Sequence, residues 1–262
     1  MSAFVGDADY AWARPWRRRV FTTAMRMGCA VADLLVATSQ GVADDLVASF
    51  RGRRSRVRVV NNPVDLRAVA SAAQESIDET DAARWQPPVV VAAGRLAEAK
   101  NYPLLIEAFA MLRQRTPASL FILGQGSQEA ALRAMIRERG LDGCVHLCGF
   151  RRNPWSYIAR ADVFALTSRY EGFGNVIAEA MACGVPVVAT SSPGTQEIVT
   201  SGADGLLVDR HEPAPFAAAL AQVLDDGRLR RRMAEAARRH AERYRTESIA
   251  LAYDRVLTEA LA

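Results

Sequence analysis

Residues 163–190, with the sequence VFALTSRYEGFGNVIAEAMACGVPVVAT, decide the fold. The stretch begins with the apolar run Val163–Leu166 and ends with a second apolar run at Val187–Ala189. Between the runs lie a glycine-rich loop, Glu171–Gly174, and a segment with helical spacing at about 175–183. Apolar runs of this length joined through a helix predict a βαβ unit, whose strands are parallel and buried on both faces.

The same alternation extends in both directions from this unit. Strands are expected at Val89–Ala93, Leu120–Leu123, Val145–Leu147, Val163–Leu166, Val187–Ala189 and Leu206–Val208. Helices are expected at about 102–115, 127–139, 155–160, 175–183, 213–224 and 228–243. Strands that alternate with helices in this way predict an α/β fold with a Rossmann-like, doubly wound parallel sheet.

The first part of the chain has a different pattern. Its expected elements are a basic amphipathic helix around 15–31, strands at Leu34–Ala37 and Val57–Val60, and between them a helix that Ser39 caps and that ends near Phe50. Two strands cannot close a doubly wound sheet, so this part is either an edge of the main sheet or the remnant of another domain. Residues 68–87 are expected to form a polar connector with some helix.

Composition excludes several classes of protein. Half of the 262 residues are hydrophobic and 24% are charged, which is typical of a soluble globular chain. The net charge of +4 is too small for a dedicated nucleic-acid binder. No apolar run reaches the ~18 to 20 residues that span a bilayer, and residues 1–13 lack a secretory signal, so a cytoplasmic location is expected.

The cysteines lack the paired spacing of metal sites. Each lies in an apolar stretch, at Cys29, Cys144, Cys148 and Cys183. We therefore predict buried, reduced thiols and no metal site, with a reactive thiol as the alternative.

The glycine-rich loop is a candidate anion site. Backbone N–H groups at a helix start, beside the carboxyl edge of a parallel sheet, favour phosphate. Glu171 and Glu179 would repel phosphate, so their expected targets are the hydroxyls of a sugar or ribose. The alternative is an ordinary turn with two solvated glutamates.

Two more loops follow strands at the same expected edge. In Gly94–Asn101, Arg95 and Lys100 are placed to set two positive charges on a diphosphate without a metal, and Lys100 is the one lysine in the chain. In Gly124–Ser127, a glutamate at position 129 replaces the third glycine of a dinucleotide motif, which disfavours nicotinamide or flavin. Three phosphate-competent turns at one edge predict a shared site, although each alone is a weak signal.

Together these motifs resemble the donor half of family-four retaining glycosyltransferases with the GT-B fold. The resemblance covers about 30–245 and rests on Gly94-Arg95-Leu96, Lys100-Asn101, Gly124-x-Gly126, Gly149-Phe150, Glu171 through Glu179 and Gly184 through Ala189. It implies that 1–63 are a remnant of a truncated N-terminal Rossmann-like, acceptor-side domain, that 64–245 are the C-terminal nucleotide-sugar-binding domain, and that 246–262 are a terminal helix that crosses back.

The resemblance also implies roles for individual residues. The catalytic groups would be Arg95 and Lys100 on the donor diphosphate and Glu171 facing the transferred sugar. The other binding residues would be Gly124, the backbone of Gly172, Phe173 and Gly174 at the phosphates or sugar, the backbone around Phe150 at the base, and Glu179 at the ribose hydroxyls.

The implied reaction moves a sugar from a nucleotide-diphosphate sugar, preferably a UDP-sugar, with retained configuration and without metal or cofactor. Its acceptor would be a glycan or a lipid-linked molecule of polysaccharide or lipopolysaccharide biosynthesis. Because most of the acceptor-side domain has no counterpart in the chain, two alternatives stay open: a truncated reading frame, or a half-enzyme whose partner chain supplies the rest. A nucleotide-sugar-binding module without turnover is the competing function.

Other features remain outside this pattern. His146 is expected in a strand, and His211 and His240 on solvated surface, with no catalytic role. The run Arg14–Arg19, with Trp12 and Trp16, predicts either peripheral contact with anionic lipid on the inner face of a membrane or a solvated helix face.

Overall fold

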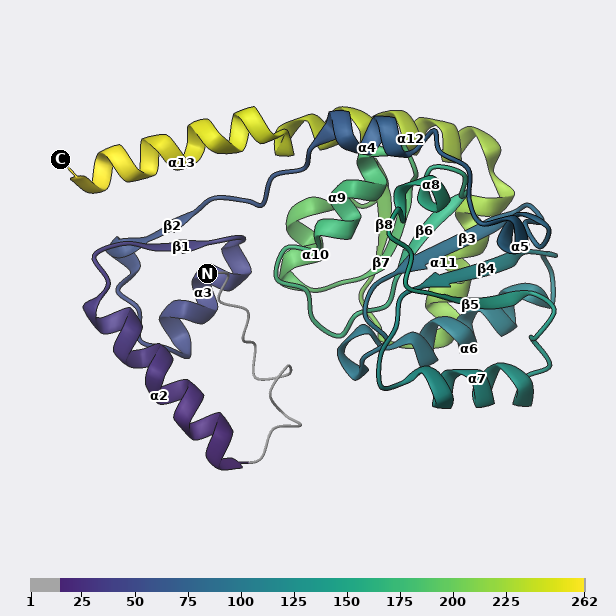
Figure 1. Cartoon of the computed structure of the whole chain (residues 1–262), viewed down its shortest axis with the longest axis horizontal. Helices are drawn as coiled ribbons and strands as arrows, with labels where there is room; N and C mark the ends of the chain where they lie inside the picture. Colours follow the sequence, from purple (N-terminus) through teal and green to yellow (C-terminus); the bar gives the residue numbers. More distant parts are fainter. Residues whose placement is uncertain (1–14, 262) are drawn as a thin grey trace.

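The computed structural model describes residues 15–261 and contains two parallel sheets (Figure 1). The larger sheet has six strands in the order β5-β4-β3-β6-β7-β8. Its strands are β3 (Val89–Ala93), β4 (Ser119–Leu123), β5 (Val145–Gly149), β6 (Val163–Leu166), β7 (Val187–Thr190) and β8 (Gly205–Val208). Each predicted strand is confirmed to within two residues at either end.

The strand order creates a switch point in the larger sheet. The chain enters at β3, moves outward to β4 and β5, and then returns to the other side of β3 with β6. Val91 pairs with Phe121 of β4 on one side and with Phe164 of β6 on the other. The connections after β3 and β6 therefore diverge, and they leave a crevice outside the carboxyl ends of these strands, where ligands bind in open α/β sheets.

Helices cover both faces of the six-stranded sheet, because alternate strand residues point to opposite sides. Val90 and Ala92 face a core with α6 (Tyr102–Arg113), α7 (Glu129–Glu138) and α11 (Pro213–Asp225). Val89 and Val91 face a second core with α4 (Leu66–Ala72), α8 (Trp155–Ile158), α9 (Asn175–Ala182) and the end of α12 (Gly227–Ala241). This is the predicted doubly wound arrangement.

The N-terminal part forms a separate unit with its own core. Its elements are α2 (Pro15–Val31), β1 (Leu35–Ala37), α3 (Gln40–Ala48), the 3-10 helix η1 (Arg54–Arg56) and β2 (Val57–Val59). Cys29, Leu46 and Phe50 pack together beneath the two strands, and Phe21 meets Phe50 edge to face. Among residues 15–261, β1 and β2 pair with each other and not with the six-stranded sheet, so the alternative of an edge of the main sheet is wrong.

Contacts with two later helices connect this unit to the rest of the chain. The backbone N–H of Gln40 and the side-chain amide of Asn61 donate to Glu197 of α10 (Pro193–Ile198), at 2.6 and 2.9 Å. The last helix, α13 (Thr246–Leu261), extends from the main sheet toward β1 and β2 (Figure 1). Near its end Glu259 lies 4.0 Å from Arg58.

Several short elements escaped the sequence patterns. They are α10 and the 3-10 helices η1, η2 (Glu98–Lys100) and η3 (Glu242–Tyr244), whereas α5 (Glu79–Ala82) lies in the connector 68–87, where some helix was expected. A capping box between Ser192 and Thr195, followed by Pro193 in the first turn, was the available signal for α10.

Two expectations about individual side chains have opposite outcomes. The expectation that His240 is solvated is wrong: its side chain is 10% exposed and its Nδ1 lies 2.8 Å from Asp204. All four cysteines are free and buried as predicted, and burial raises the pKa of each thiol. Across residues 15–261, no helix combines the length and the apolar character needed to cross a bilayer.

Candidate functional site

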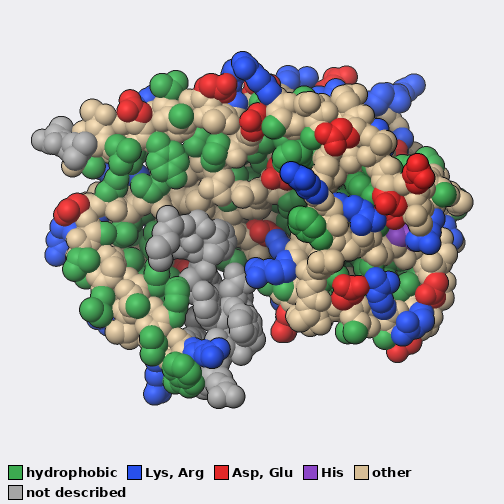
Figure 2. Space-filling model, viewed as in Figure 1, with side chains coloured by type: hydrophobic (Ala, Val, Ile, Leu, Met, Phe, Trp, Pro, Cys, Tyr) green, Lys and Arg blue, Asp and Glu red, His purple; other side chains and the backbone are tan. Residues whose placement is uncertain are grey.

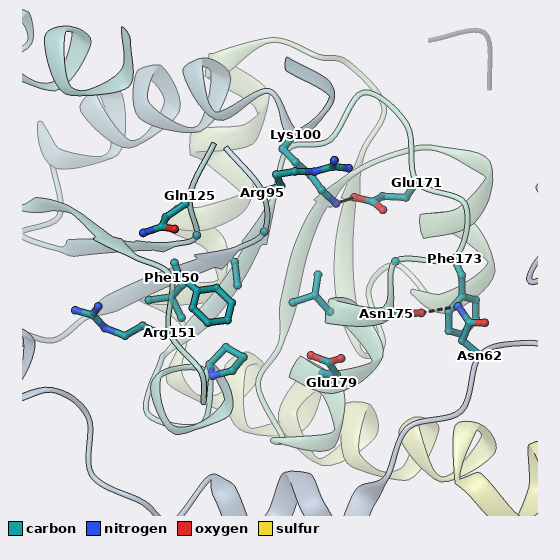
Figure 3. Close-up of a pocket in the computed structure, with 17 residues that line it drawn as sticks. Asn62, Arg95, Lys100, Gln125, Phe150, Arg151, Glu171, Phe173, Asn175 and Glu179 are labelled. Carbon is teal, nitrogen blue, oxygen red and sulfur yellow. Dashed lines mark hydrogen bonds and ion pairs between the residues drawn. The ribbon is translucent and has the colours of Figure 1, made fainter. Parts of the chain in front are cut away.

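A cavity of about 670 Å³ opens at the carboxyl ends of β3, β4 and β6, at the switch point of the sheet (Figure 3). Its wall is formed by Asn62, Ala93, Gly94, Arg95, Lys100, Leu123, Gly124, Gln125, Phe150, Arg151, Pro154, Glu171, Phe173, Gly174, Asn175, Val176 and Glu179. The three loops that were expected to share an edge therefore meet in one place. Of the predicted site residues, Gly172 alone is absent from this wall.

The loop after β3 carries Arg95 on a constrained backbone. Gly94 has φ +152°, and its carbonyl accepts a hydrogen bond from the hydroxyl of Tyr102 at 3.2 Å. Burial of Tyr102, and secondarily the Glu171 carboxylate, raise the pKa of this phenol well above its ordinary value. Tyr102 thus stays a donor to Gly94, and Arg95 is held exposed at the cavity.

Lys100 and Glu171 meet as an ion pair at the cavity wall. Nζ of Lys100 is 2.5 Å from Oε1 of Glu171, and the Ser168 hydroxyl donates to the same oxygen at 2.6 Å. Thr167 also donates to the Lys100 carbonyl at 3.1 Å, which ties the loop after β3 to the loop after β6. The sequence showed that both residues follow strands, but it did not show this ion pair.

The Gly-x-Gly loop after β4 packs directly on the loop after β3. A Cβ atom at Gly124 would lie 1.9 Å from the carbonyl oxygen of Gly94, and one at Gly126 would lie 2.3 Å from that of Leu96. Only glycine permits this approach. The two glycines therefore bring the loops together, and Gln125 between them reaches the cavity wall.

The start of α9 faces the cavity with backbone N–H groups. Gly174 caps the helix with φ +77° and has no side chain to accept from the first turn, and Asn175 and Val176 line the wall. An uncapped helix start of this kind attracts anions.

Gly172, which precedes this helix start, is not part of the cavity wall. It is buried, and α10 packs against it, since a Cβ at Gly194 would lie 2.7 Å from the Gly172 carbonyl. The Phe173 side chain is also buried, with its ring 5.3 Å from that of Tyr244. The ring of Phe173 therefore supports the loop, while the helix start that follows faces the cavity.

The other end of the cavity combines an aromatic ring with a carboxylate. Phe150 is 67% exposed beside the cavity, and Glu179 lies across from it (Figure 3). The indole N–H of Trp155 donates to Glu179 Oε2 at 2.9 Å and fixes the carboxylate. The cavity thus has a cationic end at Arg95 and Lys100 and an aromatic end at Phe150.

Sequence patterns missed part of the wall, chiefly Asn62, Gln125, Arg151 and Asn175. Asn62 comes from the crossover after β2, and its amide donates to Asn175 Oδ1 at 2.8 Å (Figure 3). The Asn-Asn-Pro turn marked this crossover, but no local pattern connects it with a helix more than a hundred residues later. Within residues 15–261, no group of three or more histidine, cysteine, aspartate or glutamate side chains could hold a metal.

The comparisons with known proteins agree with this geometry. Residues 74–240 match the family described as Glycosyl transferases group 1. The chain belongs to this family. Within it, the chain is similar to the N-acetylgalactosamine-N,N'-diacetylbacillosaminyl-diphospho-undecaprenol 4-alpha-N-acetylgalactosaminyltransferase of Campylobacter jejuni, at 34% identity over 84% of this chain and 58% of the relative. It is also 34% identical to the lipopolysaccharide core biosynthesis glycosyltransferase LpsE of Rhizobium meliloti, over 78% of this chain and 57% of that protein.

Solved structures of GT-B glycosyltransferases have the same fold. HepE of Anabaena, solved with UDP and glucose, is 26% identical with a TM-score of 0.82, over 91% of this chain and 67% of HepE. Sucrose-phosphate synthase of Thermosynechococcus elongatus has a TM-score of 0.82 at 23% identity, over 98% of this chain and 66% of the synthase. This member of the family spans a little over half the length of its curated relatives.

Proposed function

We propose that this chain is the donor-binding part of a glycosyltransferase that moves a sugar from a nucleotide-diphosphate sugar to a glycan or lipid-linked acceptor. The observation that carries the proposal is the cavity itself. The cations of Arg95 and Lys100, the uncapped start of α9 and the carboxylates of Glu171 and Glu179 line it together, at the switch point of the sheet.

The cationic end fits the diphosphate. When the bond between the anomeric carbon and the phosphate oxygen breaks, negative charge grows on the leaving phosphate. Arg95, Lys100 and the start of α9 would stabilise that charge more in the transition state than in the ground state. These groups supply the positive charge that a divalent ion supplies in other transferases, so we propose a metal-independent reaction.

The carboxylates fit hydroxyl groups. Glu171, beside Lys100, would face the transferred sugar, and Glu179, at the Phe150 end, would accept from the ribose hydroxyls. We propose a retaining transfer, as the resemblance to retaining glycosyltransferases implies, in which the new bond forms on the face that the phosphate leaves.

The aromatic end fits the base. The backbone around Phe150 would contact it, and Gly124 would close the floor of the site. Uridine is the base we propose, because HepE has been solved with UDP and with UDP-glucose at 26% and 27% identity to this chain.

The names of two relatives support the class of acceptor. One acts on a diphospho-undecaprenol glycan and another in lipopolysaccharide core synthesis. We therefore propose an acceptor presented at the inner face of a membrane to a cytoplasmic enzyme.

Helix α2 supports peripheral contact with that membrane. Its Trp16 and Val20 side chains are exposed, near Arg17 and Arg19, and Figure 2 shows apolar and basic side chains together over this part. The chain should co-sediment with vesicles that contain anionic lipid, and the Trp16→Glu variant should stay in the supernatant. Sedimentation that is equal for both variants would contradict this contact.

The domain roles follow from the same proposal. Residues 1–63 would belong to an acceptor-side domain, residues 64–245 form the donor domain, and residues 246–262 return to the first. Since the chain spans little more than half of its relatives, the competing function is a nucleotide-sugar-binding module without turnover, whereas a half-enzyme would turn over only with a partner chain.

Product formation separates these two functions. The chain would be incubated with radiolabelled UDP-glucose or UDP-N-acetylglucosamine, a lipid-linked acceptor and EDTA, beside Lys100→Ala as control. We expect donor binding with slow transfer, because holding an acceptor in line supplies ~7 to 11 kcal/mol of the barrier and needs an acceptor domain. Turnover of ~1 per second or faster would overturn that expectation. Binding without any product, even when a partner chain is added, would favour the module.

A further inference from the structure

A buried charged cluster lies directly behind the aromatic end of the cavity. The carboxylate of Asp81 has a side chain only 5% exposed, and its Oδ2 accepts from Nη2 of Arg151 at 2.7 Å. The hydroxyl of Tyr157 donates to the same oxygen at 2.7 Å. Asp81 belongs to the short helix α5, in the connector between the two sheets, whereas Arg151 and Tyr157 follow β5.

The Tyr157 hydroxyl forms further hydrogen bonds within the cluster. The Tyr157 oxygen also accepts from Nε of Arg151 at 2.8 Å and from the backbone N–H of Asp78 at 3.2 Å. The guanidinium lies over the Tyr157 ring, 5.8 Å from its centroid. Three side chains from two distant segments therefore hold one another in a single arrangement.

Stability alone is a poor explanation for such a cluster. The desolvation of a buried ion pair offsets much of its attraction, and apolar side chains of similar volume often stabilise a core as well or better. The cluster instead determines where the side chain of Arg151 lies. It fixes the side chain of Arg151, which immediately follows Phe150 and itself lines the cavity.

The loop 150–154 depends on such outside support. Phe150 is 67% exposed, so packing does little to place its ring. Besides Arg151, the loop is held at Asn153, whose amide donates to the carbonyl of Ala72 at 2.8 Å. Both anchors come from the connector, at α4 and α5. In Figure 3 the Arg151 guanidinium extends away from Lys100 and Glu171, so it holds the loop from the side opposite the phosphate groups.

We propose that Asp81 is a positioning residue for nucleobase recognition: through Arg151 and Tyr157 it fixes the loop 150–154, so that the backbone at Phe150 meets the base. This inference rests on the proposed function, because it takes the Phe150 end as the base end. It predicts that loss of the Asp81 charge weakens the base contacts and leaves the diphosphate contacts intact. Arg95 and Lys100 lie on a different loop, after β3.

The test compares two ligands by calorimetry, UDP and inorganic pyrophosphate, in buffer with EDTA. For Asp81→Asn we expect UDP affinity to fall about tenfold, the size of one charge-assisted hydrogen bond. Pyrophosphate affinity should stay unchanged, because pyrophosphate lacks the base. A general loosening of the fold would lower both affinities together.

Two further variants complete the test. Tyr157→Phe removes the hydroxyl with little change of volume and should also lower UDP affinity selectively, and it decides the matter if Asp81→Asn does not fold. Asp44→Asn is the control, because Asp44 pairs with Arg54 at 2.6 Å and neither residue lines the cavity, and it should change neither affinity.

The possible results distinguish the role of Asp81 from the proposed function on which it rests. Unchanged UDP affinity in both cluster variants, or an equal fall for UDP and pyrophosphate, overturns the role of Asp81 and leaves the proposed function standing. If the wild-type chain binds UDP no more tightly than pyrophosphate, both the role of Asp81 and the proposed function are overturned.

Discussion

Nζ of Lys100 lies 2.5 Å from Oε1 of Glu171, although 71 residues separate the two in the chain. The pair joins the loops after β3 and β6, at the switch point of the sheet. In the proposed site a diphosphate would compete with Glu171 for this cation. The carboxylate thus has two effects: it holds Lys100 in place, and it weakens the attraction between Lys100 and phosphate.

Glu171→Gln separates these effects. The amide keeps a hydrogen-bond acceptor for Ser168 and Lys100 but removes the competing negative charge. We expect UDP to bind at least as tightly as to wild type, while the extra affinity of UDP-glucose over UDP is lost with the sugar contact. Calorimetry with both ligands measures this. A tenfold weaker UDP affinity in the variant would show that Glu171 serves the phosphates by placing Lys100.

Glu179→Gln addresses the ribose. A carboxylate accepts from two vicinal hydroxyls better than an amide does, and Trp155 holds this one at 2.9 Å. Wild type should prefer UDP over 2′-deoxy-UDP, and the variant should lose most of that preference. Direct titration of both nucleotides into both proteins gives the ratio. If the preference survives in the variant, Glu179 does not contact the ribose.

The donor half of the fold follows from local sequence signals. The apolar runs at Val89–Ala93 and Val163–Leu166 are buried along their whole length, so their pattern and their burial agree residue by residue. Short helices such as α10 rest on capping and tertiary contact, because six residues supply too little periodicity to recognise. The separate pairing of β1 with β2 is likewise a long-range property that local pattern left open.

The candidate site was predictable to the extent that its residues follow strands. Arg95, Lys100 and Glu171 lie in the segments that follow β3 and β6, and parallel strands bring such segments to one edge. Asn62 and Arg151 escaped because they reach the cavity through contacts with remote segments, Asn62 to Asn175 and Arg151 to Asp81. The burial of Gly172 has the same origin, since it depends on the position of α10.

Gly124→Ala tests the close approach of two loops. The added Cβ would lie 1.9 Å from the Gly94 carbonyl oxygen, at a φ of +142° that alanine rarely adopts. We expect the free energy of unfolding to fall by about 2 kcal/mol or more and UDP affinity to fall with it. Gly143→Ala is the control, because its Cβ would meet nothing within 4 Å. Denaturant titration that shows equal stability for the two variants would refute the packing argument.

The cysteines should be inert in the folded chain. Burial raises the pKa of Cys148 and of Cys183 to about 12, and it raises the pKa of Cys29 and Cys144 as well. A raised pKa leaves little thiolate at pH 8, and the thiolate is the reactive form. A disulfide reagent should therefore react slowly with the native chain and rapidly with all four thiols in denaturant. Rapid reaction of any one native thiol would revive the alternative of a reactive cysteine.

The same shifts predict a pH dependence of stability. The folded chain keeps Cys148 and Cys183 protonated up to a pKa of about 12, whereas unfolded thiols ionise near a pKa of about 8.5. The folded state then binds more protons, so the free energy of unfolding should fall as pH rises through this window. Denaturant titrations at pH 7.5 and pH 10 measure the difference in the free energy of unfolding. This difference should be smaller in the double variant Cys148→Ala/Cys183→Ala.

The most direct test of the account is a calorimetric titration of UDP into the chain in the presence of EDTA, with wild type beside Arg95→Ala/Lys100→Ala. Charge-assisted contacts are worth about 1.5 to 3 kcal/mol each, so the double variant should bind at least about a hundredfold more weakly. Arg115→Ala, an exposed cation at the end of α6, should bind like wild type. Wild-type binding without metal that is lost in the double variant is the result that the account predicts. Wild type that fails to bind UDP, or a double variant that binds it equally well, would contradict the diphosphate site at the switch point of the sheet.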